Sequence, residues 1–242
     1  MKVYKPFHFK QFSLHQNNAA MKVGTDGVLL GAWTSIENPT TILDVGTGTG
    51  LIAMMMAQRF PNAKVVGMEI DENACLDAAL NFESSKFSHQ LELVQNSLFE
   101  FQPSTTFDLV VCNPPYFTNG LANPDEQRAV ARHLGNQVLE SWLDAIHGLM
   151  GKKATMALIL PIEYEHQVHE WSNKSGLFIA RLTRVRGRAE LPFKRVLFEL
   201  VKGEYEAEPA EAPQSKVAIL TLETTRNNRT SAYQQLTKDF YL

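Results

Sequence analysis

The sequence predicts an α/β fold, a doubly wound and mostly parallel sheet of seven strands that ends in an antiparallel hairpin. Up to residue 176, short apolar runs of strand length alternate with helical patterns, which is the order expected for a parallel sheet with crossover helices. The runs are mainly apolar, as in strands buried on both faces. After residue 176, two alternating segments follow each other closely, which indicates a hairpin at the end of the sheet.

Composition limits the possible classes. With 242 residues the chain can form one domain over residues 1–242, with a basic arm and covering segment at 1–36 and a strand and helix extension at 203–242. No apolar run approaches the roughly eighteen residues of a membrane span, and residues 1–6 lack the apolar core of a signal peptide, so we expect a cytoplasmic protein without a membrane partner. Cys75 and Cys112 have no metal-ligand spacing, and no metal site is expected.

The first 36 residues carry two features. Phe7, Phe9 and Phe12 recur at near-alternate positions among basic and polar residues, which predicts a short strand or an arm laid on the domain. Two glycines then flank Thr25 and Asp26 directly before an apolar helical run. Thr25 or Asp26 is therefore a candidate helix N-cap.

A glycine-rich turn follows the first buried strand, residues 41–45, and precedes an apolar helix over 51–60. Gly46, Gly48 and Gly50 let the backbone approach a ligand more closely than a Cβ atom allows. A dinucleotide-binding turn has a small residue at the position of Leu51, so the pattern does not match that fold.

The second strand, residues 64–69, ends in an acid. At that position Glu69 can accept hydrogen bonds from both hydroxyls of a ribose. Ile70 and Asp71 follow, and Asp71 can bracket an adenine or cap the helix that runs to residue 82. A third strand over 91–94 is followed by Asn96 and Ser97.

A rigid polar loop follows the next buried run, residues 107–112. The strand stops at Asn113, because Pro114 and Pro115 cannot donate to a ladder, and Tyr116 comes next. The prolines force extended conformations, so the loop directs an amide and an aromatic ring to the carboxyl end of a strand, where open α/β sheets bind ligands. A plain Pro-rich turn would require neither the Asn nor the aromatic residue.

The rest of the chain completes the alternation. Residues 117–136 indicate an active-site loop or short helix, and 203–213 a polar linker. We expect helices over 137–150, 163–175 and 231–241, and strands over 154–160, 177–188, 193–201 and 217–222.

Net charge is −3, so any claim of nucleic-acid binding must rest on local clusters. The first comprises Lys2, Lys5, Lys10 and Lys22 with His8 and His15. The second comprises Arg181, Arg184, Arg186, Arg188, Lys194 and Arg195, opposed along the chain only by Glu190. Each cluster predicts either a phosphate-binding surface or a solvated face.

These motifs resemble those of a known superfamily. The glycine turn with Asp44 before it, together with Asn-Pro-Pro-Tyr, resembles the motifs of class I S-adenosylmethionine-dependent methyltransferases that act on planar amino groups. Those enzymes have a Rossmann-like fold. Within them, the whole chain resembles the bacterial tRNA adenine-N6-methyltransferases that modify adenine 37 of valine tRNA. That likeness rests on residues 9–12, 21–33, 113–116 and 236–242.

The resemblance implies a cofactor, S-adenosyl-L-methionine, and roles for particular residues. Asp44 would hold the methionine ammonium directly or through water, and the segment with Asp26 would cover that end of the cofactor. The three glycines would make room for the cofactor, Glu69 and Ile70 would contact its ribose and adenine, and Ser97 stands where close relatives have an adenine-binding Asp. For catalysis it implies Asn113, Pro114, Pro115 and Tyr116.

Two other classes stay open. The first is methylation of a different planar amino group, such as guanine N2 in rRNA, adenine N6 in DNA or a glutamine amide in a protein. Glutamine methyltransferases usually carry an extra N-terminal helical domain, for which 36 residues leave no space. The second is a non-catalytic binding domain, which the two intact motifs disfavour.

Overall fold

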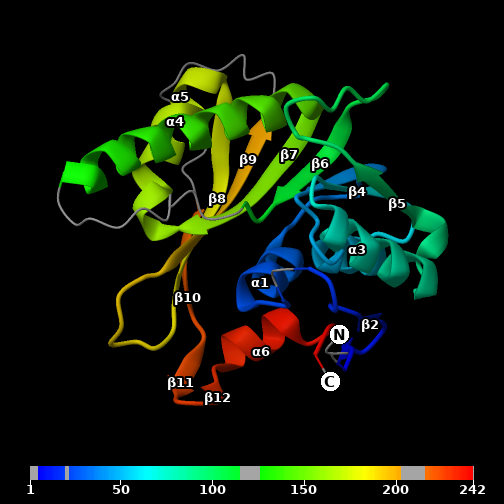
Figure 1. Cartoon of the computed structure of the whole chain (residues 1–242). Coiled ribbons are helices and arrows are strands. Elements are labelled where there is room, and N and C mark those ends of the chain that lie inside the picture. The colour runs from blue at the N-terminus through cyan, green and yellow to red at the C-terminus, as the bar shows by residue number, and fades with distance from the viewer. Residues whose placement is uncertain (1–4, 20–21, 115–125, 203–215, 242) are drawn as a thin grey trace.

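The computed structural model describes residues 5–19, 22–114, 126–202 and 216–241 (Figure 1). The helices are α1 (Thr25–Trp33), α2 (Leu51–Arg59), α3 (Glu72–Ser84), α4 (Glu126–Leu149), α5 (Glu165–Ser175) and α6 (Ser231–Thr237), with short 3-10 helices at Ser88–Gln90 and Ile162–Tyr164. The strands are β1 (Phe7–His8), β2 (Ser13–Leu14), β3 (Thr41–Val45), β4 (Lys64–Glu69), β5 (Leu91–Gln95), β6 (Phe107–Cys112), β7 (Met150–Pro161), β8 (Leu177–Arg186), β9 (Arg195–Lys202), β10 (Lys216–Thr221), β11 (Glu223–Thr225) and β12 (Asn228–Arg229).

The central sheet has the strand order β10-β8-β9-β7-β6-β3-β4-β5. Only β9 runs antiparallel to its neighbours, β7 and β8, so the α/β class and the late hairpin are confirmed. The described sheet has eight strands rather than the predicted seven. The strand predicted over 217–222, β10, accounts for the difference: it joins the sheet and pairs in parallel with β8 from Lys216↔Arg181 to Thr221↔Arg186.

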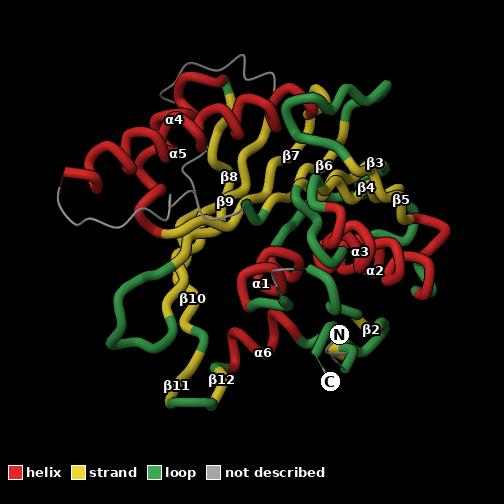
Figure 2. The backbone as a smooth tube through the Cα atoms, viewed as in Figure 1, coloured by secondary structure: helices red, strands yellow, loops and turns green. Residues whose placement is uncertain are grey.

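Helices cover both faces of the sheet (Figure 2). α1, α2 and α6 pack on one face, and α4 and α5 pack on the other. Successive residues of one strand enter opposite cores: Ile42 points to the first face and Leu43 to the second, and both are fully buried. Burial on both faces is the reason that most positions of these strands are apolar.

The ligand-binding edge follows from the topology. β3 has β4 on one side and β6 on the other, both in parallel, so the chain reverses its direction of travel across the sheet at β3. Ligands of open α/β sheets bind outside the carboxyl ends of strands at such a switch point. The loops after β3, β4, β5 and β6 all open there.

The aromatic N-terminal segment is a packed arm, as predicted. β1 and β2 pair as a small antiparallel hairpin, and Phe9 stacks on Phe12 with ring centroids 4.7 Å apart and on Tyr241 at 5.9 Å. The Lys10 amide donates to the Phe240 carbonyl at 2.8 Å. Residues from the two ends of the chain therefore pack together (Figure 1).

Several helix boundaries differ from those expected; among them, α6 ends at Thr237 rather than at residue 241. The N-cap of α1 is Gly24, without a side-chain hydrogen bond, so the proposed capping by Thr25 or Asp26 is wrong: both lie in the first turn. α4 begins at Glu126 rather than near residue 137, so it includes part of the segment 117–136 that was predicted as a loop or short helix. The Asp71 cap of α3 is confirmed, since its carboxylate accepts from the Ala74 amide at 2.7 Å. No helix in the described part of the chain is long and apolar enough to cross a membrane.

Candidate active site

Two adjoining cavities lie at the carboxyl edge of the sheet, with volumes of about 450 and 390 Å³. They share Gly46, Gly48 and Asn113. The first is also lined by Ala19, Val45, Met68, Glu69, Ile70, Asp71, Ala74, Asn96, Ser97, Leu98, Phe99 and Trp142. The second is also lined by residues 22–27, Thr47, Thr49, Leu51 and Ile52. Together they form one cleft that is divided by the glycine loop and Asn113.

The glycines of the loop have different roles. Gly46 and Gly48 have φ of +68° and +59°, and a Cβ atom on either would meet nothing within 4 Å, so both leave open space beside the cleft. Gly50, with φ of +85°, lines neither cavity, and a Cβ there would lie 2.5 Å from Cε1 of Phe82. Its lack of a side chain therefore serves close packing on α3, and its role in making room for the cofactor stays a prediction.

Glu69 lies at the end of β4 and organises the loops around it. Its Oε2 accepts from the Gly48 amide at 2.9 Å, and its Oε1 accepts from the amides of Ile70 and Asp71 at 2.8 and 3.0 Å. A carboxylate has about four lone-pair positions, so it retains capacity for ribose hydroxyls. Ile70 is 68% exposed and lines the first cavity, which places an apolar side chain next to this carboxylate.

Asp44 is completely buried beneath the glycine loop. Its Oδ2 accepts from the Thr47 hydroxyl at 2.6 Å and from the Ala53 amide at 2.9 Å, whereas Oδ1 has no partner among the described residues. Burial, together with the nearby charge of Glu69, raises the pKa of Asp44 to about 7, although the two hydrogen bonds oppose the shift. Asp44 lines neither cavity, so its position does not support a direct ligand contact.

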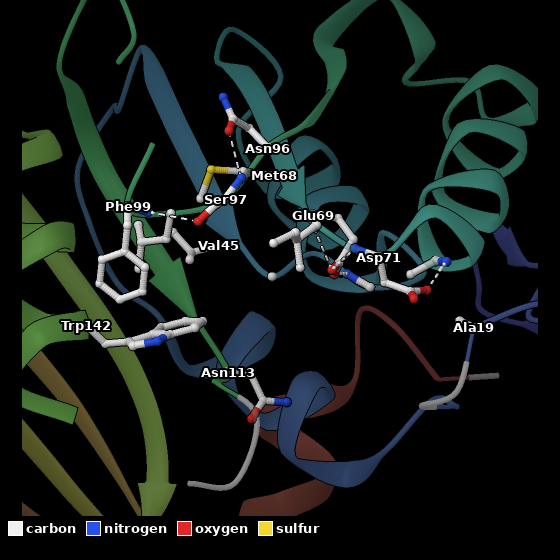
Figure 3. A pocket seen from close by; sticks show the side chains of 15 residues that line it. Ala19, Val45, Met68, Glu69, Asp71, Asn96, Ser97, Phe99, Asn113 and Trp142 are labelled. Atoms are coloured by element: carbon white, nitrogen blue, oxygen red, sulfur yellow. Dashed lines mark hydrogen bonds between the residues drawn. The ribbon is translucent and has the colours of Figure 1, made fainter. Parts of the chain in front are cut away.

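Ser97 and an aromatic pair form the far end of the first cavity. The Ser97 amide donates to Asn96 Oδ1 at 2.7 Å, and the Ser97 hydroxyl accepts from the Phe99 amide at 3.3 Å, which leaves the hydroxyl proton available. Figure 3 shows Asn96 pointing away from the cavity, with Phe99 and Trp142 side by side. Their rings are 6.4 Å apart at 86°. Trp142 was missed because its position in a helix gives no indication that it faces a cavity.

Asn113 directly follows β6 and lines both cavities (Figure 3). Its side-chain amide makes no hydrogen bond to the described residues, so its oxygen and nitrogen are available to a ligand. Pro114 is buried behind it, next to Cys112 and Trp142. Pro115 and Tyr116 lie outside the described residues, and their roles stay predictions.

Asp26 lines the second cavity and pairs with an arginine of the hairpin. Arg195 Nε donates to Asp26 Oδ2 at 2.7 Å, and both side chains are mostly buried. This ion pair joins the first turn of α1 to the start of β9.

The other end of α1 is held by the same hairpin. Arg181 forms a two-pronged pair with Glu199, with both contacts at 2.8 Å, and lies over the Trp33 ring at 3.8 Å. Glu199 is buried and also accepts from the Ser35 amide. A guanidinium group that pairs with a buried carboxylate and lies over an aromatic ring makes a strong and directional attachment.

In the folded protein, more acids oppose the basic hairpin than Glu190, its neighbour along the chain. Besides Glu199 and Asp26, Glu165 of α5 accepts from Arg184 at 2.6 Å. Strand pairing and helix packing bring these acids close, and their sequence positions did not indicate it. Arg186, which bonds to Thr221 and to the Ala189 carbonyl, has no carboxylate partner among the described residues, and Lys194 is exposed.

Sequence reasoning also missed two polar residues on α3, Asp77 and Asn81, which are buried and hydrogen-bonded to residues 15–19. They are four residues apart, within the helical stripe that contains Ala74, Ala78 and Phe82. Polar residues inside an apolar stripe are the signal that could have identified them. No group of three or more potential metal-ligating side chains occurs in the described part of the chain.

The doubly wound sheet, the open glycine loop and the acid at the end of the next strand define a class I methyltransferase. Residues 23–137 match the family model described as "Methyltransferase small domain". The fold is similar to that of a predicted O-methyltransferase from Agrobacterium tumefaciens, with a TM-score of 0.66 and 19% identity over 89% of this chain and 96% of that one. It is also similar to that of a methyltransferase from Pyrococcus furiosus, with a TM-score of 0.59 and 20% identity over 78% and 89% of the two chains.

Sequence relatives specify the family. The tRNA1(Val) (adenine(37)-N6)-methyltransferase of Parabacteroides distasonis is 41% identical over 98% of this chain and 97% of its own length. The enzymes of the same name from Flavobacterium psychrophilum and Vibrio campbellii are 40% and 37% identical, over 98% of this chain in each case and 99% and 96% of their own lengths. The chain belongs to the tRNA1(Val) (adenine(37)-N6)-methyltransferase family.

Proposed function

We propose that the protein transfers a methyl group from S-adenosylmethionine to N6 of adenine 37 in valine tRNA. The observation that carries the proposal is the position of Asn113, which lines both cavities and whose side-chain amide has no hydrogen bond to the described residues. The names of the full-length relatives support the choice of substrate.

The residues present fit the cofactor. Open space beside Gly46 and Gly48 suits a close backbone approach, and Glu69 has free acceptor capacity near the exposed Ile70. The unpartnered Oδ1 of Asp44 suits a cationic ligand reached through water. When bound, S-adenosylmethionine supplies a methyl group on a sulfonium centre.

Asn113 acts on the amine to be methylated. The lone pair of an aromatic amine is delocalised into the ring, which makes the amine a poor nucleophile. The Asn113 side-chain oxygen and the Pro114 carbonyl would accept its two hydrogens, favour a pyramidal nitrogen and direct the lone pair toward the methyl group. No strong base is needed, because the nitrogen becomes acidic as the new bond forms. Positioning and electrostatic stabilisation supply the acceleration.

Tyr116 would stack on the target base, which must be unstacked from the RNA to reach Asn113. Base stacking on an aromatic side chain contributes about 1–3 kcal/mol. Tyr116→Ala is therefore expected to weaken RNA binding and turnover together, and Tyr116→Phe to have a mild effect. An equal loss in both variants would contradict stacking.

The RNA would dock on the cations that are not paired inside the protein. Arg181, Arg184 and Arg195 are held by buried or half-buried acids, so they are poor candidates. Lys194 in the hairpin turn and Lys5 in the arm are exposed, and we assign phosphate contacts to them.

The test is methyl transfer from labelled S-adenosylmethionine to unmodified valine tRNA, with transcripts carrying guanine at position 37 as the matched control. Duplex DNA, rRNA fragments and a release-factor protein are compared at equal concentration. We expect transfer only to the tRNA with adenine 37. Transfer that is insensitive to position 37, or faster to another substrate, would refute the proposal.

A further inference from the structure

Residues 15–19 of the N-terminal segment are attached to α3 through one buried carboxylate. Asp77, which is 1% exposed, accepts hydrogen bonds from the amides of Asn17, Asn18 and Ala19 at 3.2, 2.9 and 2.8 Å and from the Asn18 side-chain nitrogen at 2.8 Å. These four contacts come from three successive residues. The carboxylate therefore fixes the local backbone and does not merely fill space.

Asn81, one turn further along α3, connects the same segment to the glycine loop. Its Oδ1 accepts from the His15 amide at 2.7 Å, and its Nδ2 donates to the carbonyls of His15 and Thr49, both at 2.8 Å. Asn81 is fully buried. One side chain thus sets the position of the segment relative to the loop that divides the cleft.

The attached segment forms part of the cleft wall. Ala19 lines the first cavity, and Figure 3 places it beyond Asp71, at the end opposite Trp142. Lys22, which lines the second cavity, donates to the carbonyls of Gln16 and Ala19 at 2.6 and 2.8 Å. Displacement of residues 15–19 would therefore change both cavities.

We propose that Asp77 and Asn81 are positioning residues that hold residues 15–19 as a wall of the cofactor cleft, so that cofactor affinity depends on this attachment. Neither residue lines a cavity, so they act through the segment and the loop. The inference rests on the proposed function, since it takes the cleft to be the S-adenosylmethionine site.

Asp77→Asn in the full chain is the first variant. It replaces one carboxylate oxygen, which accepts hydrogen bonds, with an amide nitrogen, which donates them and would face backbone amides. Glu83→Gln is the matched control, since Glu83 is an exposed acid on the same helix. Calorimetric titration with S-adenosylmethionine is expected to show affinity about tenfold to a hundredfold weaker for Asp77→Asn, the effect of losing a charged hydrogen bond, and unchanged for Glu83→Gln. KM for the cofactor should rise equally, while kcat at saturating cofactor stays within about threefold of wild type.

Hydrogen exchange separates positioning from general destabilisation. In Asp77→Asn the amides of residues 17–19 should lose protection while those of the central strands keep it. Should Asp77→Asn fail to fold, Asn18→Asp places a second carboxylate against Asp77 without altering the core, and it should weaken cofactor binding in the same way. Loss of protection at residues 17–19 together with wild-type affinity for S-adenosylmethionine would overturn this inference but not the proposed function. Failure of the wild-type protein to bind S-adenosylmethionine would overturn the proposed function as well.

Discussion

The ionisation of Asp44 gives a prediction for both stability and ligand binding. Its pKa is raised from 3.8 to about 7, chiefly because the carboxyl group is buried. The folded state therefore holds this proton more tightly than the unfolded chain does. As pH rises from about 4 to 7, this group should reduce the free energy of unfolding by about 4 kcal/mol, with little further change above pH 7.

Ligand binding should have the opposite pH dependence. A cationic cofactor favours the ionised carboxylate, so binding releases the proton when the site is protonated beforehand. With a pKa of about 7, roughly one tenth of the sites are ionised at pH 6 and nine tenths at pH 8. The apparent Kd for S-adenosylmethionine should then fall by about tenfold between these values.

Asp44→Asn isolates this group from the histidines, which titrate in the same range. The variant should bind the cofactor more weakly at pH 8, with a Kd that is nearly independent of pH. The free energy of unfolding of the variant is measured by urea denaturation at pH 5 and pH 8. It should not show the decrease between these pH values that is assigned to Asp44, and at pH 8 it should be at least as large as that of the wild-type protein. A variant that keeps the wild-type pH profile of cofactor binding would refute the argument.

Three further changes test other parts of the site. Asn113→Ala should lower kcat on tRNA by about two to three orders of magnitude, the usual loss for one preorganised polar group, with cofactor affinity nearly intact; near-normal turnover would contradict the proposed mechanism. Gly50→Ala and Gly48→Ala both strain a residue with positive φ, but only Gly50→Ala also overpacks Phe82, so it should destabilise the protein by about 1–3 kcal/mol more than Gly48→Ala does. Gly48→Ala should be the variant that weakens cofactor binding. Urea melts and calorimetry measure the two effects, and identical results for both variants would disprove the division of roles. Lys194→Glu should reduce the slope of log tRNA affinity against log salt concentration by the amount that corresponds to about one phosphate contact. Arg184→Glu should instead mainly destabilise the fold. An unchanged slope for Lys194→Glu would show that this lysine is merely solvated.

Local patterns predicted most of the fold. The strands at 41–45 and 64–69 have the predicted limits because each is a short, mainly apolar run bounded by a turn, and burial on both faces favours that composition. The cap at Asp71 follows from a local hydrogen bond to the amide three residues later. The start of α4 was misplaced because residues 117–136 are rich in polar and turn-forming types, whose weak preferences did not reveal a helix from Glu126.

The candidate site could be predicted only where one segment supplies it. Gly48, Glu69 and Asn113 each lie at the end of a predicted strand or within three residues after it, so topology alone brings them to one edge of the sheet. The Arg181–Glu199 pair depends on the register of β8 against β9, and the attachment of residues 15–19 to Asp77 spans about sixty positions. Contacts of this kind depend on tertiary packing, and the charges along one segment do not determine them.

The buried acids differ in how the protein satisfies them, and the difference identifies the one suited to a ligand. In the described part of the chain, the buried acids are Asp44, Asp77 and Glu199. Asp77 accepts four hydrogen bonds, and Glu199 is paired with Arg181 and the Ser35 amide. Asp44 alone keeps an oxygen without a partner, beneath the loop that divides the cleft. A buried and incompletely paired carboxylate is destabilising, so we propose that Asp44 interacts with a bound cationic ligand, reached through water, and is not there to support the fold.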